Sequence, residues 1–103
     1  MANGNARNIE YITNFSVLFG QVRLLFFAKS REIVGRKEAE LEVVRLTTPR
    51  DVLQTLLQEY PGLGEISDNI VLSLNEEYLE IDDQQIVLEA GDELAIIPPI
   101  SGG

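Results

Sequence analysis

The last eight residues of the chain have the clearest potential for chemistry, and they read Ile96-Ile97-Pro98-Pro99-Ile100-Ser101-Gly102-Gly103. Pro98 and Pro99 cannot extend a strand ladder and favour polyproline II, so we expect residues 98–103 to project as a stiff tail of roughly 19 Å. Gly102 and Gly103 lack Cβ atoms, so they could enter a narrow channel and bring the terminal carboxylate beside another protein's catalytic groups. A chain end that merely contains two small residues is the competing interpretation. The apolar strand, the double proline and the glycine pair together favour a functional tail.

The composition argues against a self-contained active site. The 103 residues include neither Cys nor His. Their absence removes thiolate nucleophiles, zinc-thiolate sites, the commonest general base and the commonest transition-metal ligand. Paired carboxylates such as Asp82 and Asp83 have no neighbouring His or Lys with which to form an acid-base constellation. We therefore expect the catalytic groups to belong to a partner protein.

The charge distribution is strongly acidic and uneven. The chain has 17 Asp and Glu against 8 Lys and Arg, a net charge of -9, and residues 51–103 contain no basic residue. This charge disfavours nucleic acids and anionic membranes as partners. A metal site, a solvated face and a docking surface for a basic partner are three interpretations of the acidic residues, and the metal site is the least favoured because EF-hand spacing is absent. The residues concerned are Glu76, Glu77, Glu80, Asp82, Asp83, Glu89, Asp92 and Glu93.

Alternating apolar residues predict a central strand that carries further candidate site residues. Two sets of three alternate over residues 22–27: Val22, Leu24 and Phe26 on one face, and Arg23, Leu25 and Phe27 on the other. We assign the first set to the core, which leaves Phe27, like Ile97 of the last strand, on an outer face. Phe27 and Ile97 are thus predicted to form an interface, and Tyr78 is a third exposed candidate. Leu25 fits the core and the interface equally well.

The remaining elements predict a two-layer α+β domain. A turn around Gly35 leads to a strand over residues 38–43, which would pair with the first strand as a hairpin. Thr48 is a predicted helix cap with Pro49 at the first helical position, and Pro61-Gly62 ends the helix. The helix has an apolar stripe of Val52, Leu53, Leu56, Leu57 and Tyr60. Later strands are expected at residues 70–74 and 94–97, with short pieces at Ile81 and residues 86–88.

We divide the chain into a flexible extension at residues 1–20, one domain at 21–97 and the tail at 98–103. About 100 residues is a usual size for one domain. No apolar run approaches the roughly 20 residues that span a bilayer, and the start of the chain lacks the pattern of a secretory signal. The expected location is the cytosol.

From Val22 to Gly103 the sequence resembles the small, sulfur-carrying subunits of molybdopterin synthase, which are ubiquitin-like β-grasp proteins. The resemblance rests on Val22-Arg23-Leu24-Leu25-Phe26-Phe27-Ala28 followed by Arg31-Glu32, and on Gly91-Asp92-Glu93 through Ile97 to the Gly-Gly end. It implies an α+β fold with a mixed sheet, one main helix packed on one face and an extended C-terminal tail.

The resemblance also implies a carrier cycle. A ubiquitin-activating-type adenylyltransferase uses ATP to adenylate the Gly103 carboxylate, which then becomes a thiocarboxylate. The tail, with Pro98, Pro99, Ile100, Ser101 and Gly102, enters the large catalytic subunit of a heterotetramer. There the sulfur passes to cyclic pyranopterin monophosphate during molybdenum cofactor biosynthesis. The chain would thus act as the sulfur-donating subunit of a sulfurtransferase, with no bound cofactor or metal of its own.

By position in the family motif, Phe27, Tyr78 and Ile97 are expected to contact the large subunit, and Arg31 the activating enzyme. Two alternatives remain open. The chain could be a sulfur carrier for thiamin or tRNA thiolation, although the double proline argues against this. It could also be a ubiquitin-like interaction module or protein modifier that is never thiolated.

Overall fold

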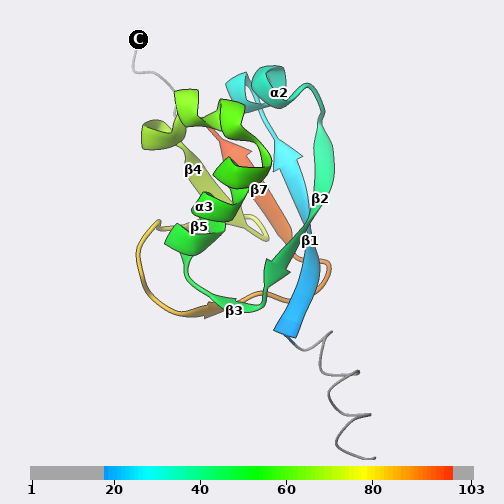
Figure 1. Cartoon of the computed structure of the whole chain (residues 1–103), viewed down its shortest axis with the longest axis vertical. Coiled ribbons are helices and arrows are strands. Elements are labelled where there is room, and N and C mark those ends of the chain that lie inside the picture. The colour runs from blue at the N-terminus through cyan, green and yellow to red at the C-terminus, as the bar shows by residue number, and fades with distance from the viewer. Residues whose placement is uncertain (1–17, 99–103) are drawn as a thin grey trace, which may run out of the picture.

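The computed structural model of the chain describes residues 18–98 (Figure 1). Predictions for residues 1–17, and for Pro99, Ile100, Ser101, Gly102 and Gly103 of the tail, lie outside the described residues. Within the described part, no helix is long and apolar enough to cross a membrane.

A five-stranded mixed sheet forms one layer of the domain, in the order β2-β1-β7-β4-β5. Its strands are β1 (Phe19–Phe26), β2 (Glu38–Val44), β4 (Val71–Leu74), β5 (Glu77–Leu79) and β7 (Glu93–Ile97). β1 is antiparallel to β2 and parallel to β7, which in turn is antiparallel to β4. The parallel pair therefore lies inside the sheet. Its two strands end together, with Phe26 of β1 level with Ile96 of β7.

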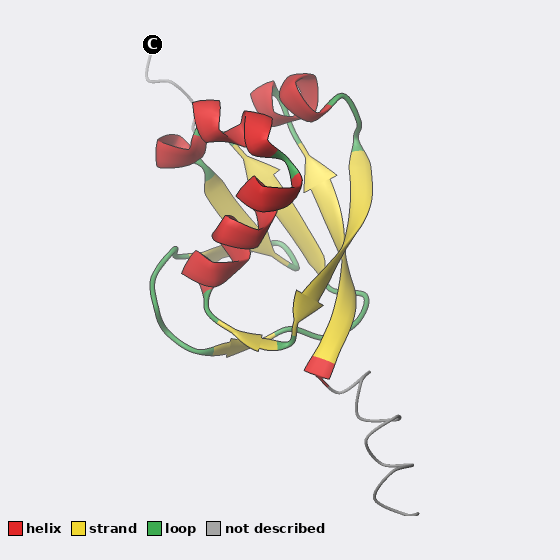
Figure 2. Ribbon diagram, in the orientation of Figure 1, coloured by secondary structure: helices red, strands yellow, loops and turns green. Residues whose placement is uncertain are grey.

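The second layer is the helix α3 (Pro49–Glu59), which covers one face of the sheet (Figure 2). A two-stranded sheet of β3 (Leu46–Thr47) and β6 (Ile86–Val87) flanks it, and the helix is followed by the 3-10 turns η1 (Pro61–Glu65) and η2 (Ser67–Asn69). This arrangement confirms the predicted α+β class with one main helix on one face.

The core lies between the sheet and α3, as the alternation of β1 predicts. The buried members of the sheet include Val22, Leu24, Phe26, Leu41, Val43, Leu72, Leu94 and Ile96. Val52 and Leu56 of α3 are buried against them, and Leu53 and Leu57 pack at the margin. Phe26 meets the Tyr60 ring edge-on, with 5.3 Å between the ring centroids.

The start of α3 confirms the capping prediction. Thr48 has extended backbone angles, and its Oγ1 accepts a hydrogen bond from the Asp51 N–H at 3.1 Å. Pro49 is the first helical residue. An N–H at this position would have no acceptor within the helix, so proline loses no hydrogen bond there. The helix ends at Glu59, because Pro61 begins the following 3-10 turn.

Three local features differ from the prediction. The expected turn before the second strand contains a six-residue helix, α2 (Lys29–Val34), which ends because Gly35 takes a left-handed φ of 84°. The strand β1 begins at Phe19, two residues before the domain boundary proposed at residue 21, and it pairs there with Val44. β5 was not predicted, because a three-residue strand shows too little alternation. It follows a tight turn in which Asn75 and Glu76 both have positive φ.

Candidate functional site

The candidate site is the face of the sheet opposite α3, which we call the open face. No helix of the described chain covers it, and its central residues come from three adjacent strands. A shallow hollow of about 220 Å³ on this face is lined by Leu25, Phe27, Ser73, Glu76, Glu93, Ala95 and Ile97. The register explains the grouping, because Leu25, Ala95 and Ser73 are level with one another across β1, β7 and β4. The hollow is thus an apolar surface that borders the end of β7.

The structure brings two of the predicted interface residues together. Phe27, with 41% of its surface exposed, and the partly buried Ile97 both line the hollow. Leu25 lines it too and is partly buried on this face, so the core interpretation of Leu25 was wrong. Tyr78 is the most exposed large apolar residue described, at 72%. It is level with Ser73 across the β4–β5 pair, so its side chain is on the open face next to the hollow.

Arg31 lies apart from the hollow, on α2. This helix follows β1 in the chain and lies near the C-terminal ends of β1 and β7 (Figure 1). The exposed Arg31 donates from Nε to the Phe26 carbonyl at 3.2 Å. Arg31 is thus bonded to the end of β1 and is not among the residues that line the hollow.

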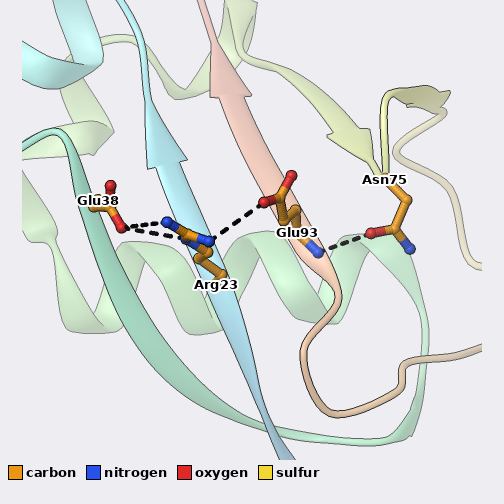
Figure 3. Close-up of polar contacts among 4 residues, drawn as sticks. All are labelled: Arg23, Glu38, Asn75 and Glu93. Carbon is orange, nitrogen blue, oxygen red and sulfur yellow. Dashed lines mark hydrogen bonds and ion pairs between the residues drawn. The ribbon is translucent and has the colours of Figure 1, made fainter.

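An exposed polar network lies on the open face toward the opposite end of the strands (Figure 3). Arg23 Nη2 is 2.8 Å from Glu38 Oε1, and Arg23 Nη1 is 3.6 Å from Glu93 Oε2. The hydrogen bond and charge of Glu38 raise the pKa of Arg23, with a smaller contribution from the charge of Glu93. Asn75 Oδ1 accepts from the Glu93 N–H at 2.9 Å. Glu93 therefore belongs both to this network and to the lining of the hollow.

The tail begins beside three residues joined by hydrogen bonds, Phe27, Ser30 and Ile96, which we call the corner. Ile97 is the last residue of β7 and is level with Val71 of β4, and the half-buried Pro98 follows. The fully buried Ser30 of α2 reaches the carbonyl of Ile96 with its hydroxyl, at 3.0 Å. Neither Ser30 nor the lining residues Ser73 and Ala95 were predicted as site residues, whereas Glu76 and Glu93 were among the acidic residues considered for a docking surface. An outward position in an alternating strand was the available signal for Ala95, whereas nothing local marks Ser30.

Several of the acidic residues hold neighbouring structure in place. Asp83 pairs with Arg50 at 2.9 Å and Glu89 with Arg45 at 2.7 Å. Asp92 accepts the Glu89 N–H at 2.7 Å, which closes the turn before β7. Among residues 18–98, no group of three or more acidic side chains is arranged to hold a metal ion. Their observed contacts are ion pairs and turn hydrogen bonds.

Comparisons with known proteins match most of this chain. The sequence matches the ThiS family over residues 24–103. The molybdopterin synthase sulfur carrier subunit of Homo sapiens is 40% identical over 83 residues, which are 81% of this chain and 94% of that protein.

Solved structures share the fold. The small archaeal modifier protein 1 of Haloferax volcanii superposes with a TM-score of 0.66 at 26% identity, over 79% of this chain and 99% of that one. A chain from the complex of subunits 1 and 2 of the Helicobacter pylori molybdopterin-converting factor gives 0.57 at 23% identity, over 81% and 99% of the two chains. These likenesses confirm the ubiquitin-like β-grasp fold.

Proposed function

The chain belongs to the ThiS family and has molybdopterin synthase sulfur carrier subunits among its relatives, and we propose that it carries sulfur as a thiocarboxylate on Gly103. The observation that carries the proposal is the agreement of sequence and geometry at the end of the chain. The family match extends to residue 103. The strand β7 ends at Ile97, which lines an exposed apolar hollow.

Activation must precede sulfur loading, because a carboxylate is a poor electrophile. A Gly103 carboxylate oxygen attacks the α-phosphorus of ATP in an activating enzyme, and pyrophosphate leaves. A sulfur nucleophile at the oxidation level of sulfide then attacks the acyl carbon of the adenylate and expels AMP, which leaves a thiocarboxylate. ATP is consumed by the activating enzyme in this scheme, and this chain needs no cofactor of its own.

The loaded sulfur then attacks an acceptor carbon in the active site of a large subunit, and an oxygen substituent of that carbon leaves with its bonding electron pair. Water cleaves the resulting thioester, so the sulfur stays on the acceptor and Gly103 returns as a carboxylate. We propose cyclic pyranopterin monophosphate as the acceptor, in line with the relatives' name. A chain without Cys or His suits this role, since the large subunit supplies the catalytic groups.

The open face supplies the binding surface for the large subunit in this proposal. Phe27 and Ile97 line one hollow, and Tyr78 projects beside it with most of its surface exposed. Contiguous apolar surface of this kind marks interaction sites, and buried aromatic anchors dominate binding energies. Arg31, on the other side of the tail base, is the proposed contact with the activating enzyme. The whole cycle is proposed to take place in the cytosol.

The test is the intact mass of the full chain after incubation with its activating enzyme, ATP and a sulfur source. The expected result is a mass increase equal to the replacement of one oxygen by one sulfur, located at Gly103 by peptide mapping. Release of pyrophosphate in the same reaction shows that the activating enzyme works. Pyrophosphate release without the mass change would contradict the sulfur-carrier proposal.

The likeness to the Haloferax volcanii modifier protein favours a second candidate, a protein modifier. The same adenylate would then be attacked by a lysine amine, and an amide bond to Gly103 would replace the thiocarboxylate. Peptide mapping of cell extracts after cleavage at glutamate separates the two functions, because the modifier leaves its residues 94–103, ending in Gly102-Gly103, as a remnant on lysines of other proteins. A thiolated tail with no such remnant excludes the modifier.

A further inference from the structure

Ser30 occupies an unusual position for a serine. Its side chain is fully buried, and among residues 18–98 no other polar side chain is classed as buried. A buried hydroxyl needs hydrogen-bond partners, because desolvation without them is costly. The identity of those partners therefore shows what the hydroxyl holds in place.

The hydroxyl joins three backbone groups at the end of the parallel strand pair. Its oxygen accepts from the Phe27 N–H at 3.0 Å, and its hydrogen lies within reach of the Phe27 carbonyl at 2.7 Å and the Ile96 carbonyl at 3.0 Å. Serines near helix starts commonly bond to local backbone, which accounts for the Phe27 contacts. The contact with Ile96 is different, because it spans 66 positions of sequence and reaches the strand that leads into the tail.

The Ile96 carbonyl belongs to the last rung of the sheet on this side. It also accepts from the Phe27 N–H at 3.2 Å, and Phe26 and Ile96 are the last residues paired between β1 and β7. Pro98 and Pro99 have no N–H, so they cannot add a further rung. Among the described residues, the last backbone hydrogen bond between β1 and β7 is therefore the one at the Ile96 carbonyl, which Ser30 also contacts.

The backbone beside Ser30 is strained. Ala28 has φ 52° and ψ -125°, a region that glycine adopts far more readily than alanine. Such strain persists where surrounding contacts enforce it, and it clusters at functional positions. Ala28 lies in the chain between Phe27 and Ser30, which are joined to each other by two of these hydrogen bonds.

From this geometry we infer that Ser30 is a positioning residue for sulfur transfer, which holds the Ile96 carbonyl and Phe27 so that the tail leaves the sheet in one direction. This inference rests on the proposed function. If residues 98–103 extend over roughly 19 Å as the sequence predicts, a rotation of only about 3° at their base displaces the chain end by about 1 Å. Misplacement by 1 Å is enough to cost about 100-fold in rate when reacting groups must be aligned.

The experiment compares three full-length variants as C-terminal thiocarboxylates with the purified large subunit. Ser30→Ala removes the hydroxyl, Ser30→Thr keeps it, and Val52→Ala destabilises the core from α3, away from the tail. The single-turnover transfer rate at saturating large subunit is measured together with the dissociation constant and the unfolding midpoint. Rate and affinity are thereby separated from stability.

We expect Ser30→Ala to lower the saturated transfer rate roughly ten-fold while affinity changes less than about two-fold. Ser30→Thr should retain most of the rate, and Val52→Ala should keep it despite its lower midpoint. A wild-type rate in Ser30→Ala, or an equal loss in Val52→Ala, would overturn the assignment. Wild-type protein that transfers no sulfur in the same assay would instead refute the proposed function.

Amide hydrogen exchange provides a readout that needs no activity. In the wild-type chain the Phe27 amide, at the end of its strand, should exchange as slowly as that of Leu24 at mid-strand. Ser30→Ala should speed exchange at Phe27 and Ile97 and leave Leu41 of β2 unchanged. Rapid wild-type exchange at Phe27 would show that Ser30 does not hold this corner, whether or not the variant folds.

Discussion

Phe27, Ala28 and Ser30 form a short segment in which each residue is in an unusual environment. Phe27 is an exposed aromatic residue, Ala28 has a positive φ, and Ser30 is a fully buried serine. All three lie where β1 ends beside the last residues of β7. Single substitutions in this segment should therefore separate the stability of the fold from its function.

Ala28→Gly should stabilise the fold. Glycine adopts φ 52° and ψ -125° without a Cβ clash, and the strain relieved is about 1 kcal/mol after the greater freedom of glycine in the unfolded chain is counted. Urea unfolding measures the change. Ala39→Gly in β2, where the backbone is extended, is the control and should lose about 0.5 to 1 kcal/mol. A destabilised Ala28→Gly chain would contradict the strain at this turn.

Phe27→Asp should weaken binding to the large subunit by at least about 2 kcal/mol, because an aromatic anchor of the hollow becomes a charge. Stability should change little, since Phe27 lies outside the core. Calorimetric titration measures the affinity. Val87→Asp replaces an apolar residue on β6 that is more exposed than Phe27, at 55% against 41%, and is not part of the hollow, so this variant should bind normally. Equal affinity of both variants would exclude the open face as the binding surface.

At the scale of elements, β1 connects the core with the candidate site. Its inward residues are buried beneath α3. Its outward residues include Arg23, which belongs to the polar network, and Leu25, which lines the hollow. The helix α3 buries only one face of the sheet, and that asymmetry leaves the open face available to a partner. A stable α3 therefore stabilises the sheet that carries the site, although α3 itself lies on the opposite face.

Thr48→Ala should destabilise the domain by about 1 kcal/mol, because the Asp51 N–H loses its hydrogen-bond acceptor at the helix start. Chemical denaturation measures the loss. Thr55→Ala is the matched control within the same helix. Its hydroxyl donates back to the Asp51 carbonyl, a contact that adds little to helices, so the change should stay within about 0.5 kcal/mol. Equal losses in both variants would show that the cap has no special weight.

At the scale of the whole molecule, charge and shape divide the protein into two regions. Seven of the eight basic residues lie between Arg23 and Arg50, and the chain after Arg50 has 12 acidic residues and no basic one. Ion pairs such as Arg45 with Glu89 and Arg50 with Asp83 join the two regions. The tail belongs to the acidic region, while the basic α2 lies beside its base.

Deletion of Gly103 should abolish sulfur transfer and leave the unfolding midpoint unchanged, because the core is complete within residues 18–98. The transfer assay and thermal unfolding are run on the same preparation. Ser101→Ala, which alters the tail but keeps its terminal carboxylate, is the control and should remain active. A truncated chain that transfers sulfur at the normal rate would remove Gly103 from the mechanism.

Local chemistry and periodicity were enough to predict several features of the fold. Alternation in residues 22–27 identified the buried face of β1, and Thr48 with Pro49 identified the start of α3, because these signals need only neighbouring residues. The outward positions of Phe27 and Ile97 followed from the same alternation. The function of Gly103 and the other tail residues stays a prediction.

The contacts between residues far apart in the sequence could be seen only in the folded chain. The pairing of β1 with β7 brings Phe27 beside Ile97, sets Arg23 level with Glu93, and brings Ser30 to the Ile96 carbonyl. The structure also places Leu25, for which the sequence left the core and the interface open, in the lining of the hollow. Strand register is set by the packing of the whole sheet against α3, so no local pattern in the chain encodes these contacts.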